Sequence, residues 1–92
     1  MTNVPETEEE VSGVSDPRGE LLAAASLYQR LPDARRRVRI REDAFVTQRQ
    51  MAEALGVSAM TLSRWERGVK PRARHAQAYL ELLEQLQQLP TA

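Results

Sequence analysis

The segment 47–68, TQRQMAEALGVSAMTLSRWERG, constrains the fold more than any other part of this chain. Thr47 and Gln50 form the pattern of a capping box, so a helix is expected to begin directly after Thr47. Gly56 stands where that helix should end, because glycine readily adopts the left-handed conformation of a helix C-terminus. Ser58 is then placed to cap a second helix. The segment therefore predicts two short helices joined by a tight turn.

The second of these helices, expected over residues 59–67, has two different faces. Leu62 and Trp65 lie three residues apart and point to one side, so they are assigned to the protein core. The other side is small, polar and basic, and it is made of Ala59, Met60, Ser63, Arg64 and Arg67. An exposed arginine on such a face can donate two hydrogen bonds to O6 and N7 of guanine in the major groove. Arg64 is therefore predicted to read a guanine in double-stranded DNA.

The pattern TQxxxAxxLGVSxxTxSRWExG, as it stands at positions 47 to 68, resembles the lambda-repressor-like family of DNA-binding domains, also called the Cro/CI or xenobiotic-response-element type. The resemblance extends over residues 33–89 and implies an all-α fold, a small helix-turn-helix bundle of about five helices. It implies base contacts in the major groove from Ala59, Met60, Ser63 and Arg64. It implies phosphate contacts from Gln48, Thr61, Arg67, Lys70 and Arg72. It also implies a structural ion pair between Arg41 and Glu66.

Two positions depart from the family pattern. Family members commonly have a glycine just after their first helix, but this chain has Phe45, and a bulky residue disfavours a positive φ. The end of that helix is therefore expected to differ. Relatives often have Gln where this chain has Ala59, which can touch no more than a thymine methyl group. Base readout is therefore expected to depend on Arg64 and Met60.

The net charge of zero conceals a division along the chain. Residues 1–20 hold six acidic residues and one arginine, a net charge of −5, whereas residues 21–92 have a net charge of +5. Residues 1–19 also have few large apolar side chains, so they are expected to form a disordered acidic tail. Residues 20–92 are expected to form one basic helix-turn-helix domain, whose positive charge would attract phosphates.

Three further helices are expected outside the central segment, over residues 20–30, 34–44 and 74–89. The arginine run 35–41 in the second of them is interpreted mainly as a solvated face. The long last helix has a leucine stripe made of Leu82, Leu83, Leu86 and Leu89. This stripe has two interpretations, which are packing within the core and the contact surface of a homodimer.

The composition excludes several classes of function. The chain has no cysteine and a single histidine, His75, so thiolate or histidine metal clusters and histidine-based catalysis are not expected. No nucleophile with a base, no carboxylate pair and no phosphate-binding loop is apparent, so we expect no enzymatic activity and no cofactor. No apolar run approaches the roughly 18 residues that span a membrane, and no signal peptide is apparent. A soluble, cytoplasmic protein is expected.

The sequence thus predicts a transcription regulator of bacterial or phage type, most simply a repressor that binds a short inverted repeat as a homodimer. The alternative, from another class, is an antitoxin or other protein inhibitor that regulates its own gene through the same domain. In that case the acidic tail or the last helix would bind a protein partner, because acidic disordered segments often fold on binding.

Overall fold

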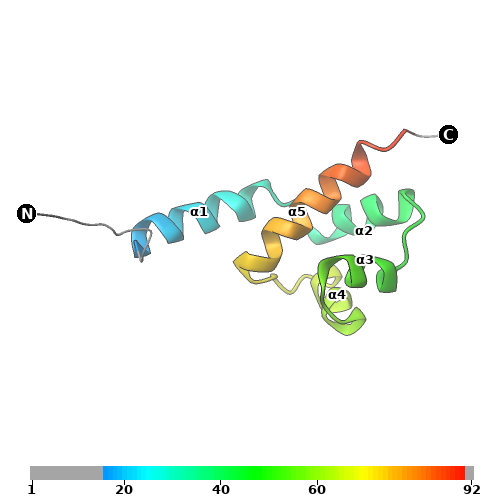
Figure 1. Cartoon of the computed structure of the whole chain (residues 1–92), viewed down its shortest axis with the longest axis horizontal. Coiled ribbons are helices and arrows are strands. Elements are labelled where there is room, and N and C mark those ends of the chain that lie inside the picture. Colours follow the sequence, from blue (N-terminus) through cyan, green and yellow to red (C-terminus); the bar gives the residue numbers. More distant parts are fainter. Residues whose placement is uncertain (1–15, 91–92) are drawn as a thin grey trace, which may run out of the picture.

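A computed structural model describes residues 16–90, and five α-helices and no strand are found in this part of the chain (Figure 1). The helices are α1 (Pro17–Arg30), α2 (Ala34–Asp43), α3 (Gln48–Leu55), α4 (Ala59–Glu66) and α5 (Ala73–Gln87). The all-α fold expected from the sequence is therefore confirmed. The expected acidic tail falls mostly on residues 1–15, which lie outside the described residues.

The first helix begins earlier than expected. The sequence assigned residues 17–19 to the tail, but Pro17 is the first residue of α1. Proline is well suited to this position, because its fixed φ matches the helix and its missing N–H would have no partner there. The boundaries of the central pair are as expected to within one residue, since Thr47 and Gln50 form the capping box and the Ser58 hydroxyl accepts from the backbone N–H of Thr61.

The core lies between α2, α3, α4 and the C-terminal part of α5. Its buried members are Ile40, Met51, Ala52, Leu62, Trp65, Tyr79 and Leu83. A second cluster joins α1 to α5 and consists of Leu27, Ala76 and Leu80. The placement of Leu62 and Trp65 shows that α4 uses one face to attach itself to the bundle.

The leucine stripe of α5 is divided between the core and the surface. Leu83 is fully buried, whereas Leu82 and Leu86 are partly buried and pack against the same cluster. Leu89 follows the helix and is 55% exposed. Leu83 therefore serves the core and is not available as a dimer contact, and Leu89 is the most exposed of the four leucines.

The turn after α2 keeps the geometry of a glycine turn although a phenylalanine occupies it. Phe45 has a φ of 60°, and its N–H donates to the carbonyl of Glu42 while the N–H of Val46 donates to the carbonyl of Arg41. This is the Schellman arrangement that usually ends in glycine. The expectation that this helix end would differ is therefore wrong: the backbone bonds hold the left-handed conformation, and the Phe45 side chain clashes with nothing because it is 93% exposed.

Replacing Phe45 with glycine is expected to raise the free energy of unfolding by about 0.5–1 kcal/mol, because the left-handed conformation costs a non-glycine residue more than glycine loses in backbone entropy. Urea denaturation checks this. As a matched control, Gly56→Ala should lower stability by about 1 kcal/mol. Gly56 has a φ of 71°, and an added methyl group there would meet no atom within 4 Å, so only the backbone term changes. A Phe45→Gly variant of lower stability would contradict this account.

Candidate nucleic-acid interface

Helix α4 presents a free face to solvent on the side opposite its core residues. Leu62 and Trp65 are buried, whereas Met60 is 63% exposed and Arg64 is also exposed. Ala59 is exposed at the start of the helix and Ser63 is partly buried beside it. The structure therefore brings the four predicted base-contacting residues to one side of α4.

Met60 and Arg64 contact each other on this face. The Nη2 atom of Arg64 lies 3.6 Å from the sulfur of Met60, one helical turn earlier. Residues four apart on a helix are neighbours, so the thioether of Met60 lies alongside the guanidinium of Arg64. This contact favours one orientation of the Arg64 side chain. No ion pair holds Arg64 among the described residues, and its remaining N–H groups are free to meet a ligand.

A buried polar network joins α4 to α2 and α3. The guanidinium of Arg41 donates to Glu66 through Nε at 2.6 Å and through Nη2 at 3.0 Å, and Nη1 donates to the carbonyl of Val46 at 2.8 Å. The side-chain amide of Gln48 donates to the same carboxylate at 2.8 Å. Hydrogen bonding to Glu66 raises the pKa of Arg41 above its ordinary value, so the Arg41 guanidinium stays charged at any ordinary pH. The network therefore links the start of α3 and the end of α2 to the end of α4.

Several cationic residues gather where α4 faces the start of α5. A cleft of about 420 Å³ is lined by Thr61, Arg64, Trp65, Val69, Lys70, Arg72, Arg74 and His75. Arg67, Lys70 and Arg72 are exposed and Thr61 is partly buried. The cleft therefore unites Thr61, Lys70 and Arg72 with Arg64, while Arg67 and Gln48 lie outside its lining. This concentration of positive charge suits a polyanion.

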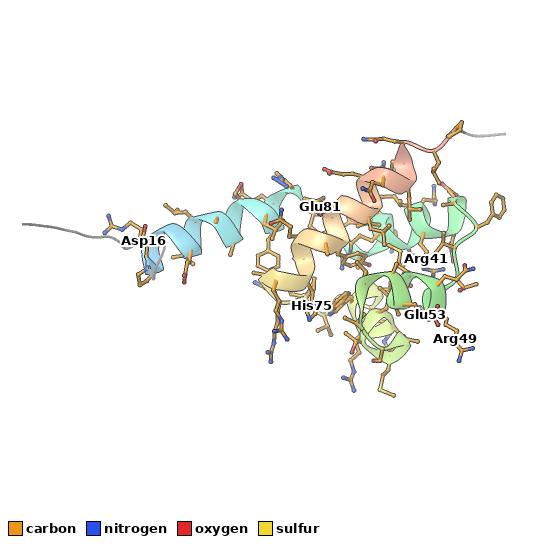
Figure 2. The ribbon with its side chains drawn as sticks, viewed as in Figure 1. Asp16, Arg41, Arg49, Glu53, His75 and Glu81 are labelled. Atoms are coloured by element: carbon orange, nitrogen blue, oxygen red, sulfur yellow. The ribbon has the colours of Figure 1, made fainter. Side chains whose placement is uncertain are left out.

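Two ionisable residues of the cleft were not singled out as site residues by the sequence. Arg74 lines the cleft, and His75 lies on the first turn of α5, where its ring centroid is 5.8 Å from that of Trp65 (Figure 2). The signal that could have drawn attention to Arg74 is its position two residues after Arg72, in the basic segment that follows Pro71. A position near a helix N-terminus adds a favourable backbone dipole for anions.

Lys70 has an intramolecular neighbour that the sequence did not indicate. Its ammonium nitrogen lies 4.4 Å from the ring centroid of Tyr28 on α1, a cation–π distance. The hydroxyl of Tyr28 donates to the carbonyl of Pro71 at 2.5 Å. Helix α1 therefore contacts the loop that connects α4 to α5.

The arginine run of α2 is not uniformly solvated. Arg37 is buried, and its guanidinium donates to the carbonyl of Pro32 and, at 2.9 Å, to the carbonyl of Trp65. It also lies 5.4 Å from the ring centroid of Tyr79, whose pKa is raised by burial. Interpreting the run as a solvated face was therefore wrong for Arg37, because the end of α4 leaves a carbonyl group that needs a donor.

The described residues contain no group of three His, Asp or Glu side chains that could hold a metal ion. In the same part of the chain, no helix has the length and apolar character needed to cross a membrane.

Comparison with known proteins agrees with the geometry. The chain matches a family model described as helix-turn-helix over residues 39–85, which include α3, α4, the cleft and most of α5. Helix α1 and the start of α2 lie before the matched region. Comparison with curated proteins and with solved structures found no significant match. The arrangement of α3 and α4 and this match over half of the chain together establish that the protein belongs to the Cro/CI-type helix-turn-helix family of DNA-binding regulators.

Proposed function

We propose that this protein binds double-stranded DNA in a sequence-specific manner by inserting α4 into the major groove, and that it represses transcription by covering a promoter. The observation that carries the proposal is the exposed face of Ala59, Met60 and Arg64, opposite the buried Leu62 and Trp65. A helix held from behind by the core can enter a groove without disturbing the fold.

Direct readout centres on Arg64. Its guanidinium would donate to O6 and N7 of guanine, the commonest base-specific contact in the major groove. Met60, in contact with Arg64, would pack against an apolar base edge such as a thymine methyl group, and Ala59 is small enough to do the same. Ser63 would contribute a hydroxyl that can donate or accept. The preferred site should therefore contain a guanine next to a thymine.

Backbone contacts would come from the rim of the exposed face. The proposed phosphate-contacting residues are Gln48, Thr61, Arg67, Lys70 and Arg72. Arg74 joins them because it lines the same cleft. Gln48 would have two tasks, since its amide donates to Glu66 and its place at the start of α3 suits a phosphate. Each positive charge that meets a phosphate contributes affinity without sequence information.

Replacing Arg72 with alanine is expected to weaken binding to specific and random duplexes alike. The slope of log affinity against log salt should fall by roughly 0.9, the value for one lost phosphate contact. Fluorescence anisotropy titrations at several salt concentrations measure this slope. Arg18→Ala is the matched control. Arg18 is exposed on the first turn of α1, so this substitution removes the same charge at a site away from the cleft. Equal slopes for the parent and Arg72→Ala would contradict a phosphate contact.

Selection from a pool of random duplex oligonucleotides tests the function as a whole. We expect recovery of a guanine-containing inverted repeat with half-sites about one helical turn apart. Placed over a promoter, that site should make a reporter gene less active when the protein is expressed, and Arg64→Ala should restore expression. Failure to enrich any sequence would contradict specific binding, and a rise in reporter activity would contradict repression.

A further inference from the structure

Helix α1 projects from the bundle with its N-terminal half largely unpacked (Figure 1). Leu27 is its one buried residue, and Leu21 and Leu22 are 68% and 62% exposed. A short helix is marginally stable in water without tertiary packing. Residues 21–25, LLAAA, are also apolar on all sides, a composition more typical of a covered helix. The α1 helix therefore has little packing within the described chain and leaves apolar surface exposed.

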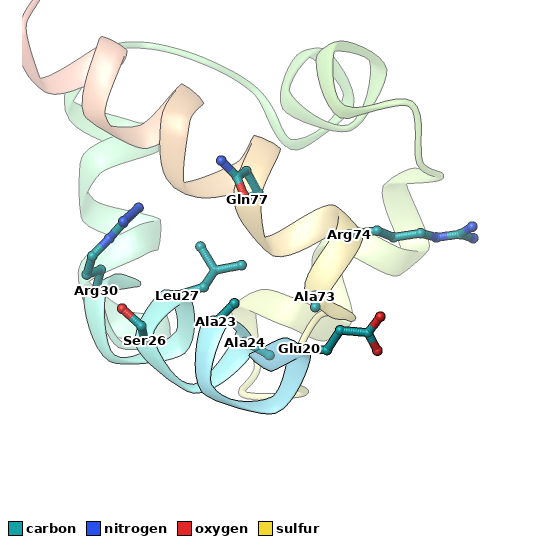
Figure 3. A pocket seen from close by; sticks show the side chains of 9 residues that line it. All are labelled: Glu20, Ala23, Ala24, Ser26, Leu27, Arg30, Ala73, Arg74 and Gln77. Carbon is teal, nitrogen blue, oxygen red and sulfur yellow. The ribbon is translucent and has the colours of Figure 1, made fainter. Parts of the chain in front are cut away.

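A cleft runs between α1, from Glu20 to Arg30, and the start of α5. It has a volume of about 630 Å³ and is lined by Glu20, Ala23, Ala24, Ser26, Leu27, Arg30, Ala73, Arg74 and Gln77 (Figure 3). Most of the lining side chains in its middle are small. Small side chains let a second helix approach closely, because interhelical distance follows the side chains at the contact. The cleft therefore has the shape of a helix-binding groove.

The α1 side of the cleft has a self-complementary pattern. Glu20 stands at one end and Arg30 at the other, ten residues apart, which is about 15 Å along a helix. Neither forms an ion pair with another described residue. Rotating a second α1 by 180° about the level of residue 25 places Glu20 opposite the second copy's Arg30. The same rotation places the small Ala23 opposite the second copy's Leu27.

We propose that a second copy of this chain docks its α1 antiparallel into this cleft, so that α1 and α5 of both copies form a symmetric four-helix contact. An antiparallel pair also aligns the helix dipoles favourably. The contact is isologous, as a two-fold dimer requires. Arg74 lies at the same end of the cleft as Glu20, so this carboxylate would face two guanidinium groups (Figure 3). The proposal concerns self-association alone and does not depend on DNA binding.

Charge reversal in the full chain tests the pairing. Sedimentation equilibrium across the micromolar range should reveal a dimer, and Glu20→Arg or Arg30→Glu should each raise its dissociation constant by about tenfold. The double variant Glu20→Arg with Arg30→Glu should restore the parent value, because both ion pairs are rebuilt in the opposite sense. Arg18→Glu, on another side of α1, should leave dimerisation unchanged. Circular dichroism checks folding, which should persist because all three positions are exposed.

Engineered cysteines locate the contact independently, because the chain has no cysteine of its own. Ser26 lies on the cleft side of α1 near the proposed two-fold axis, and Gln29 lies on the same helix outside the cleft lining. Mild oxidation should link Ser26→Cys into a dimer and leave Gln29→Cys monomeric. The proposal is overturned by a monomer at all concentrations, by equal cross-linking of both variants, or by a dimer that only Leu89→Glu disrupts.

Discussion

Replacing Glu66 with alanine is expected to lower the free energy of unfolding by about 3–5 kcal/mol, the usual cost of leaving one partner of a buried ion pair alone. The side chains of Arg41 and Glu66 are 10% and 5% exposed, so water cannot replace the lost carboxylate at Arg41. Gln48 loses its acceptor at the same time. Because small domains are stable by only about 5–15 kcal/mol, the variant should be close to unfolding. Urea denaturation followed by the fluorescence of Trp65, the single tryptophan, measures the loss.

Two further variants separate the charge from the packing. The double variant Arg41→Met with Glu66→Leu should be much closer to the parent than Glu66→Ala, since apolar side chains of similar size can replace a buried pair at little cost. Gln48→Ala should cost about 1 kcal/mol, the net value of one hydrogen bond. If Glu66→Ala were as stable as the parent, the network would not hold α4 in place.

Replacing Arg64 with alanine should weaken binding to the selected duplex by about ten- to hundredfold, equivalent to about 1–3 kcal/mol for one bidentate base contact. Arg64 is exposed on α4, so folding should be unchanged. The guanine preference at one position of the site should disappear. Competition titrations against duplexes that carry each base at that position measure both effects.

Arg64→Lys tests the geometry of the same contact. Lysine keeps the charge but lacks the planar fork of the guanidinium, so the guanine preference should weaken while the salt dependence stays near that of the parent. Arg18→Ala again controls for the loss of one charge. An Arg64→Ala variant with the affinity and base preference of the parent would contradict major-groove readout by α4.

Local sequence was enough to predict the helix-turn-helix pair. Thr47 with Gln50, Gly56 and Ser58 act through hydrogen bonds and backbone preferences within a few residues, so their effect is the same in any fold. The inward direction of Leu62 and Trp65 follows from helical periodicity alone. The same periodicity places Arg64 on the opposite side of the helix, which is therefore exposed.

Contacts between distant segments could not be predicted in this way. Arg37 reaches the carbonyl of Trp65, 28 residues later, and Tyr28 reaches the carbonyl of Pro71, 43 residues later. A helical pattern says which side of a helix is apolar, but it does not say which carbonyl group on another helix lacks a donor. Arg37 was therefore assigned to solvent together with its neighbours.

Phe45 shows at a single residue how local preference and the surrounding structure can differ. Its own preference argued against a positive φ, yet the hydrogen bonds of the turn to the carbonyls of Arg41 and Glu42 impose one. Sequence by itself determined where the helices of the motif begin and end and which face of α4 is free, because these depend on interactions within one or two turns. Tertiary structure alone decided that Arg37 is buried, that Lys70 lies against the ring of Tyr28 and that α1 projects from the bundle, because these depend on groups that meet only after the helices have packed.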